Sequence, residues 1–224
     1  MSSPTAVIGS GKRRGCRETA ATVRTERWGT DADAISGSVK STAGLPAVRT
    51  GAYPAFVIVL GIDPGTASTG YGVIAFDGRD ARALAQGTVR TGPREPPEQR
   101  LATIQRAIQE LIAAHSPAAV VFESLYIGAN PRTIMSVCQA RGAALAVCGT
   151  HGIACTEYAP AQVKTAVCGF GGAGKEQVMR MVRQLLSLPE TPESDHAADA
   201  LALALCHAWS ARAEERFARA RAAR

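Results

Sequence analysis

Short apolar runs and amphipathic stretches alternate along the chain from residue 55 onward, and their order limits the possible folds. The expected strands are residues 56–62, 70–76, 83–90, 118–123 and 153–158. The expected helices are residues 98–115, 131–148, 161–167, 175–188 and 194–213. The spacing of apolar residues separates the two kinds of segment. Three strands spaced for an antiparallel meander, followed by alternating helix and strand, predict an α/β fold with a mixed five-stranded sheet flanked by helices.

The composition divides the chain into three parts. Residues 1–54 are rich in Ser, Thr, Gly and Arg, show no periodicity and carry eight basic and four acidic residues, so we predict a disordered basic extension. This extension either adds nonspecific affinity for nucleic acid or is unimportant to the domain that follows. Residues 55–213 form the predicted folded domain, and residues 214–224 form an Arg/Ala-rich tail that should fray.

Composition and charge leave several classes of function open and exclude others. The 224 residues are 46% hydrophobic and 20% charged, as in ordinary soluble proteins. The net charge of +6 is compatible with a polyanionic partner without requiring one. None of the six cysteines belongs to a CxxC pair, so we expect reduced core cysteines in a cytoplasmic protein and no zinc site. No apolar run is long enough for a membrane span, and no secretory signal is expected.

Two of the expected core strands end in a carboxylate. The segment FVIVLGIDPG places Asp63 directly after one strand and before a Pro-Gly turn, and AAVVFE ends another strand in Glu123. An ionised carboxylate beside an apolar core is unfavourable unless something pairs with it. The ends of neighbouring parallel strands lie side by side, and such edges of open α/β sheets are where sites form. We therefore expect the two carboxylates to meet at one edge of the sheet.

A helix supplies further acidic groups. In SDHAADALALALCH, His196 and Asp199 are three residues apart and Asp195 and Asp199 are four apart, so either pair shares a helix face. The apolar run that follows predicts packing on the sheet, with the acidic first turns at one end of the core. Oxygen-rich sites select Mg²⁺ or Mn²⁺, and two such ions can hold a phosphate, activate a water and stabilise a leaving oxygen. The pattern therefore indicates phosphoester chemistry.

Each of these residues also has a simpler interpretation. Asp195 is a favourable first-turn residue of a helix, and Asp63 alone fits a turn before Pro-Gly. His196 alone fits a surface histidine. The functional interpretation depends on all of them occurring together in this order of strands and helix.

Five separated segments carry a more specific signal: GIDPGTASTGYGVI, VVFESLYIGANPRT, QARGAA, EYAPAQVKTAVCGFGGAGKEQV and DHAADALALALCH. In order and spacing they resemble the RuvC family of bacterial Holliday-junction resolvases over about residues 56–210. The resemblance implies a ribonuclease H-like fold. It also implies a homodimeric, Mg²⁺-dependent endonuclease, with two ions per active site, that nicks two opposed strands of a four-way DNA junction. A further implied partner is the RuvA–RuvB branch-migration complex.

The resemblance also implies where the site lies. The catalytic and metal-binding positions of the family fall on Asp63, Glu123, His196 and Asp199. Some members carry Asp where His196 stands. Whether His196 is a ligand, a general base, or is partly replaced by Asp195 therefore stays open.

Other residues are candidates for contacts with DNA. Tyr126 follows the second acidic strand end, where its ring could stack on an unpaired base or instead close over the core. Lys164 and Lys175 resemble family lysines near the scissile phosphate, although alone they fit solvated surface residues. Arg132 and Arg141 could add phosphate contacts.

Two glycine-rich segments resemble nucleotide-binding loops. GFGGAGKE has the GxxxxGK frame of a P-loop, but Glu176 stands where Ser or Thr would bind magnesium and a helix precedes it, so a flexible loop near DNA fits better. GIDPGTASTG is also similar to a phosphate loop of actin-like ATPases and sugar kinases. Those enzymes need two such domains, whereas this chain holds one.

A structure-selective DNA-binding protein without catalysis is the main alternative function, and a relative acting on RNA or on flaps is another. Acidic groups without metal would repel phosphate, which favours the enzyme. The helix expected at residues 131–148 is apolar on much of its surface. We expect it to supply much of a dimer interface, since a two-fold dimer matches the near two-fold symmetry of a junction.

Overall fold

The computed structural model describes residues 56–125 and 131–222. Its strands are β1 (Val57–Asp63), β2 (Ser68–Phe76), β3 (Ala81–Arg90), β4 (Ala119–Glu123) and β5 (Ala154–Tyr158). Its helices are α1 (Pro97–His115), α2 (Pro131–Thr150), α3 (Pro160–Cys168), α4 (Lys175–Leu185) and α5 (Asp195–Ala222). Every expected strand and helix occurs, with boundaries shifted by a few residues except at the end of α5.

The five strands form one mixed sheet in the order β3-β2-β1-β4-β5. The first three strands pair antiparallel, and β1, β4 and β5 pair parallel. The predicted architecture is therefore confirmed. Strand β1 lies at the centre, and its residues 59–62 are buried, which explains the continuous apolar run in its sequence.

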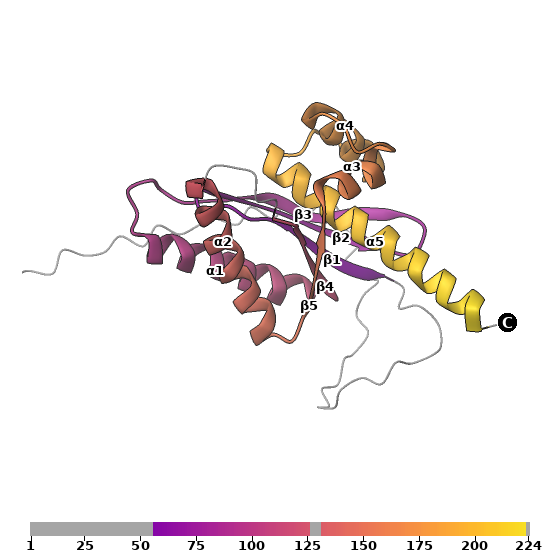
Figure 1. Ribbon diagram of the computed structural model, residues 1–224, viewed down its shortest axis with the longest axis horizontal. Helices are drawn as coiled ribbons and strands as arrows, with labels where there is room; N and C mark the ends of the chain where they lie inside the picture. Colours follow the sequence, from indigo (N-terminus) through magenta and orange to yellow (C-terminus); the bar gives the residue numbers. More distant parts are fainter. Residues whose placement is uncertain (1–55, 126–130, 223–224) are drawn as a thin grey trace, which may run out of the picture.

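Helices cover both faces of the sheet, with α1 and α2 on one face and α5, α3 and α4 on the other (Figure 1). Alternate residues of β1 enter the two cores. Leu60 packs in the cluster that includes Ile104 and Ile108 of α1, whereas Val59 packs in the cluster that includes Leu201 of α5. This alternation follows from the two-residue period of a strand.

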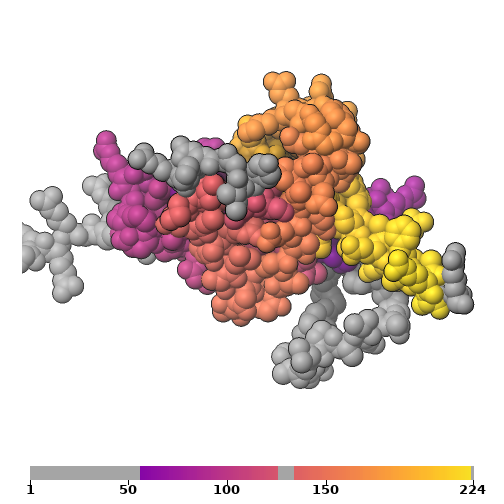
Figure 2. Space-filling view, in the orientation of Figure 1, coloured from indigo at the N-terminus to yellow at the C-terminus, as the bar shows by residue number. Residues whose placement is uncertain are grey.

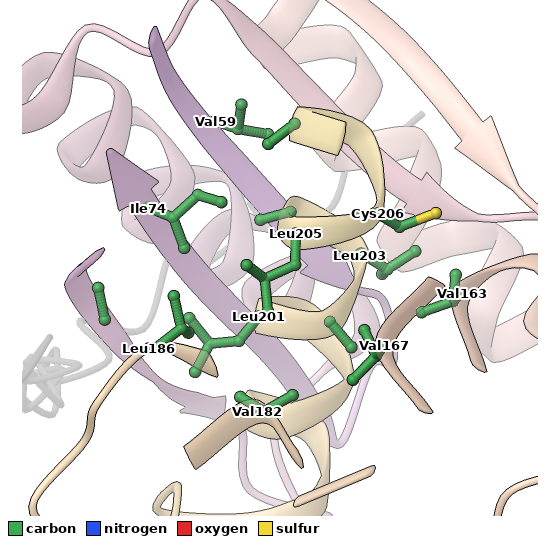
Figure 3. Close-up of a cluster of buried hydrophobic side chains, with 14 of the residues drawn as sticks. Val59, Ile74, Val163, Val167, Val182, Leu186, Leu201, Leu203, Leu205 and Cys206 are labelled. Atoms are coloured by element: carbon green, nitrogen blue, oxygen red, sulfur yellow. The ribbon is translucent and has the colours of Figure 1, made fainter. Parts of the chain in front are cut away.

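Helix α5 lies between the sheet and the pair α3 and α4. Every residue from Ala200 to Cys206 is buried, and Figure 3 shows leucines of α5 between strand residues and valines of α3 and α4. A helix enclosed in this way is apolar all round, which accounts for the sequence ALALALC.

Glycines in β1 and β2 let α5 approach the sheet closely. A Cβ on Gly61 would lie 1.9 Å from the carbonyl oxygen of Ala200, and one on Gly70 would lie 2.1 Å from that of His196. Side chains at these two positions would push the helix away. The glycines therefore set the distance between the sheet edge and the first turns of α5.

The end of α5 differs from the expectation that the chain frays after Ala213. The helix continues to Ala222, and its final turns extend past the sheet (Figure 1). Figure 2 shows these turns, in yellow, projecting at one end of the domain. Residues beyond Arg212 are exposed, so packing does not hold them. Their composition explains the helix, because Ala, Arg and Glu have high helix propensity.

The cysteines of the described ranges are all free thiols. Cys148 and Cys206 are buried, as predicted for core residues, whereas Cys138 and Cys155 are exposed. The expectation that the cysteines are core residues is therefore wrong for these two. In the same ranges, every helix is too short or too polar to cross a membrane.

Candidate active site at the end of the parallel strands

The two acidic strand ends meet at one edge of the sheet. Strands β1 and β4 are parallel neighbours, and Ile62 pairs in register with Phe122. The next residue of each strand is Asp63 or Glu123, so the register brings these two carboxylates side by side. The preceding residues are fully buried, and the polar pair therefore marks the point where the core ends.

Helix α5 brings its acidic first turns to the same edge. Ser194 precedes the helix, and its hydroxyl accepts a hydrogen bond of 3.1 Å from the main-chain N–H of Ala197. The same hydroxyl is hydrogen-bonded at 2.6 Å to that of Thr88 in β3, which ties the start of the helix to the sheet. This cap fixes the turn that carries His196 and Asp199.

Three carboxylates line one pocket. Asp63, Glu123 and Asp199 surround it together with Lys164 of α3, and the remaining lining residues are Pro160, Val163, Val178 and Leu203. The acidic groups thus come from β1, β4 and α5, three elements that are far apart in the sequence. Their oxygens face a partly apolar wall, where charges interact more strongly than in water.

Burial and mutual repulsion disfavour ionisation of two of these groups. The pKa of Glu123 rises to about 7, chiefly because of burial and then because of Asp63 and Asp199, while Lys164 opposes the shift. Burial and then Asp63 raise the pKa of Asp199 to about 6, against the opposing charges of Lys175 and His196. A cation in the pocket would relieve both effects.

His196 contacts the acidic cluster directly. Its Nδ1 lies 2.6 Å from Oδ2 of Asp63, and this hydrogen bond raises the pKa of the imidazole while partial burial opposes the rise. Asp195 points elsewhere, since its Oδ2 lies 3.6 Å from Nζ of Lys175 in a largely exposed ion pair. In this arrangement, therefore, the imidazole and not the neighbouring carboxylate contacts Asp63.

The donor atoms suit a hard divalent cation, although they are not arranged as a finished ligand shell. Carboxylate oxygens are the ligands that Mg²⁺ and Mn²⁺ prefer. Within residues 56–125 and 131–222, however, no three carboxylate, imidazole or thiol side chains stand around one point as a ligand set. In this arrangement Oδ2 of Asp63 is engaged in its hydrogen bond with Nδ1 of His196.

Comparison with known proteins decides the family. The sequence model of "Crossover junction endodeoxyribonuclease RuvC" matches residues 59–207. This chain belongs to the RuvC family. The RuvC of Pelotomaculum thermopropionicum is 43% identical over 152 residues, which cover 68% of this chain and 93% of the relative. The RuvC of Moorella thermoacetica is 46% identical over 163 residues, covering 71% and 98%.

A solved structure of the RuvC family shows the same fold. Thermus thermophilus RuvC in complex with a Holliday junction substrate superposes with a TM-score of 0.68 at 40% identity, over 70% of this chain and 96% of that one. The predicted ribonuclease H-like fold is thereby confirmed. The match to the RuvC family model begins at residue 59, so residues 1–54 lie outside it.

The expected DNA contacts fall in different places. Lys164 lines the pocket, and Lys175 begins α4 beside Asp195. Tyr126 lies outside the described residues, as does the side chain of Arg132.

Arg141 does not lie where a phosphate contact needs it. Its side chain is only 8% exposed and forms an ion pair with Glu157, and its Nη1 donates to the main-chain oxygen of Glu123 at 2.9 Å. The burial of Arg141 against β4 and β5 could not be predicted from the sequence QARG, because an arginine on a helix is usually solvated.

Polar residues that give almost no signal in the sequence fix the turn after Asp63. Thr66 is buried there, and it bonds to Ser136 of α2 and to Arg100 of α1. These residues are 70 and 34 positions away from Thr66 in the chain. The signal for Thr66 in the sequence is the run TAST, which follows Pro64 and Gly65 after the first apolar strand.

Proposed function

We propose that this chain is a divalent-metal-dependent endonuclease that resolves four-way DNA junctions by paired, symmetric nicks. The observation that carries the proposal is the pocket shared by Asp63, Glu123 and Asp199 at the carboxyl ends of two parallel strands. Family membership supports it, because a RuvC at 40% identity is described in complex with a Holliday junction substrate.

The metal-binding residues in this proposal are Asp63, Glu123 and Asp199, with His196 beside them. Their oxygens fit Mg²⁺ or Mn²⁺, and the raised pKa values of Glu123 and Asp199 indicate a site that gains from added positive charge. Two bound ions would activate a water and stabilise the leaving oxygen. A bound cation would also offset the electrostatic repulsion among the three carboxylates.

The chain's own residues bind and orient the substrate. Lys164 lines the pocket beside Glu123, where its ammonium group can offset the negative charge of a scissile phosphate. Lys175 lies at the rim in its exposed pair with Asp195, and it can exchange that carboxylate for a DNA phosphate. His196 holds Asp63 through its hydrogen bond and can take up a proton at the edge of the site.

The proposed reaction is hydrolysis of a phosphodiester bond. The oxygen of a water molecule attacks phosphorus in line, the bond from phosphorus to the 3′ oxygen breaks, and one proton of the water passes to that oxygen. The products are a 5′-phosphate and a 3′-hydroxyl. Such a nick can be rejoined by ligation.

Paired nicks require two active sites related by symmetry. Helix α2 presents Met135 with 63% of its surface exposed, together with the exposed Leu145, on the outside of the domain. We propose that this helix forms the contact between two copies of the chain, since a two-fold dimer would present its sites to the two opposed strands. Association with a RuvA–RuvB complex and a cytoplasmic location beside the chromosome belong to the same proposal.

The test is incubation of the purified chain with a synthetic mobile four-way junction, in Mg²⁺ or in EDTA. We expect nicks at symmetric positions on two opposed strands with Mg²⁺ only. Linear duplex, flap and RNA substrates of the same length serve as controls. Junction binding without nicks in any divalent metal would instead support a binding protein, and preferential cleavage of flaps or RNA would identify another substrate.

A further inference from the structure

Helix α2 contacts the chain beside each of the two acidic strand ends. Ser136 reaches Thr66, three residues after Asp63, and Arg141 reaches the main-chain oxygen of Glu123. We propose that α2 positions both strand-end carboxylates for cleavage, through Ser136 on one side and Arg141 on the other. The inference rests on the proposed function. Neither residue lines the pocket, so both act as positioning residues.

Thr66 is fixed by bonds to each of its polar groups. It is 7% exposed, its N–H donates to Oγ of Ser136 at 3.4 Å, and the two hydroxyls are hydrogen-bonded to each other. Arg100 of α1 donates from Nη2 to its hydroxyl at 3.2 Å, and Thr91 donates to its carbonyl oxygen at 2.5 Å. Leaving a buried polar group without its hydrogen-bond partner destabilises the folded state, so this network restrains the turn.

The restrained turn is also closed within itself. The hydroxyl of Thr69 donates to the carbonyl oxygen of Gly65 at 2.7 Å, and it accepts from the N–H of the same residue at 3.4 Å. Arg100 adds a bond of 2.8 Å from Nε to the hydroxyl of Thr91 at the end of β3. The segment after Asp63 is therefore held by β3, α1 and α2 together.

Arg141 of α2 restrains the second acidic strand end, at Glu123. Its guanidinium lies 5.1 Å from the ring centroid of Phe122, forms an ion pair with Glu157 of β5 and donates to the carbonyl oxygen of Glu123. The planar fork of an arginine can make these contacts at once, which a lysine cannot. The peptide bond after Glu123 is thus fixed relative to β5 and α2.

These contacts matter because ligand side chains act only when they are placed accurately. Loss of groups that orient ligands typically lowers metal affinity or activity about 10- to 100-fold. A single helix that holds both strand ends keeps Asp63 and Glu123 in a constant relation to each other. Displacement of α2 would move the two carboxylates together.

The first test removes the hydroxyl network. We expect Thr66→Val and Ser136→Ala to lower kcat for junction cleavage about 10- to 100-fold. KM, and the Kd for junctions in EDTA, should stay within about twofold, because no residue at the rim changes. Thr66→Ser, which keeps the hydroxyl, should restore kcat. Thr150→Val removes a hydroxyl at the far end of α2 and should leave kcat unchanged.

The second test needs no cleavage. In metal-free protein, we expect faster hydrogen–deuterium exchange of the amides in residues 64–69 for Thr66→Val and Ser136→Ala, but not for Thr150→Val. Arg141→Lys keeps the charge and loses the fork, so exchange should rise in residues 123–125. Its kcat should fall while the Kd for junctions holds.

Wild-type exchange rates together with wild-type kcat in these variants would overturn the inference. A Kd for junctions that rises in step with the loss of kcat would also overturn it, because that pattern indicates damage to the DNA-binding surface. If Thr66→Val does not fold, Ser136→Ala decides, since this serine is only half-buried. If the wild-type chain cuts no junction, the proposed function fails, and the exchange measurements still decide whether α2 restrains the strand ends.

Discussion

At the scale of single residues, the acidic pocket combines groups that destabilise one another. Asp63, Glu123 and Asp199 face the same space, and the pKa values of Glu123 and Asp199 are raised to about 7 and about 6. Nearby positive charge comes from Lys164 beside Glu123 and from Lys175 beside Asp199. This arrangement does not favour the stability of the fold, and it agrees with the proposed role of the three carboxylates in binding cations.

Replacement of Asp63 tests the role of the first strand end. We expect Asp63→Asn to bind junctions with near wild-type affinity and to lose at least about 100-fold in cleavage rate, since metal ions supply several kcal/mol of stabilisation in the transition state. The measurements are single-turnover cleavage in Mg²⁺ and binding in EDTA. Asp80→Asn, in the exposed turn before β3, is the matched control. Cleavage by Asp63→Asn at the wild-type rate would show that the site is assigned wrongly.

The raised pKa of Glu123 predicts a dependence of stability on pH. Between its ordinary value of 4.5 and about 7, the folded state binds more protons than the unfolded state, so its contribution to stability is present below pH 4.5 and is lost as the pH rises through about 7. In metal-free protein, Glu123→Gln should therefore gain stability relative to the wild type at pH 8, by about 2–3 kcal/mol, and little at pH 4.5. Urea unfolding at both pH values measures this. A difference that does not change with pH would contradict the assigned cause.

At the scale of elements, the close contact between α5 and the sheet determines where the site forms. Gly61 and Gly70 leave room for the backbone of α5, and the same contact brings His196 and Asp199 to the ends of β1 and β4. Core packing and site assembly therefore depend on the same contact.

A side chain on Gly61 should disturb that contact. The added Cβ of Gly61→Ala would lie 1.9 Å from the carbonyl oxygen of Ala200, and neither backbone can move without repacking the core. We expect a loss of about 3 kcal/mol in the free energy of unfolding. Gly149→Ala in α2, where nothing lies within 4 Å of the new Cβ, is the control and should be neutral or stabilising. Equal stability of both variants in urea unfolding would refute the predicted contact.

Helix α2 carries the predicted interface. We expect Met135→Glu to shift a dimer toward monomer, because it puts a charge in place of an apolar side chain that is 63% exposed in the single chain. Sedimentation measures the mass. Phe217→Glu, which alters an equally exposed residue of the α5 extension, should leave the dimer intact. An unchanged dimer mass for Met135→Glu would remove α2 from the interface.

At the scale of the whole molecule, the architecture could be predicted from the sequence, but the polar contacts between distant elements could not. The apolar runs that end in Asp63 and Glu123 were sufficient to predict the parallel pair and the edge where they meet. The burial of Arg141 was not predictable, because its ion pair with Glu157 exists only once α2 lies on β5. The local pattern of apolar residues predicts strands and helices. A contact such as this ion pair depends instead on how distant elements pack together.

Removal of the N-terminal segment tests the predicted division of the chain. The family match starts at residue 59, so we expect residues 55–224 to cleave junctions at a rate within about twofold of the full chain. The segment carries eight basic and four acidic residues, so direct contacts to phosphates would steepen the salt dependence of binding. Junction binding by both chains is measured between low and moderate salt. A shallower slope in the shortened chain would assign the segment to DNA binding.

The position of α5 after both acidic strand ends has a consequence for biosynthesis. Asp63 and Glu123 leave the ribosome well before Asp199, which arrives only with α5. A nascent or prematurely terminated polypeptide that stops before residue 195 lacks both the third carboxylate and the segment that fills the interior between sheet and α3. On the proposed function, a polypeptide that stops before α5 cannot nick the chromosome, because Asp199 arrives on the same helix that fills this part of the core.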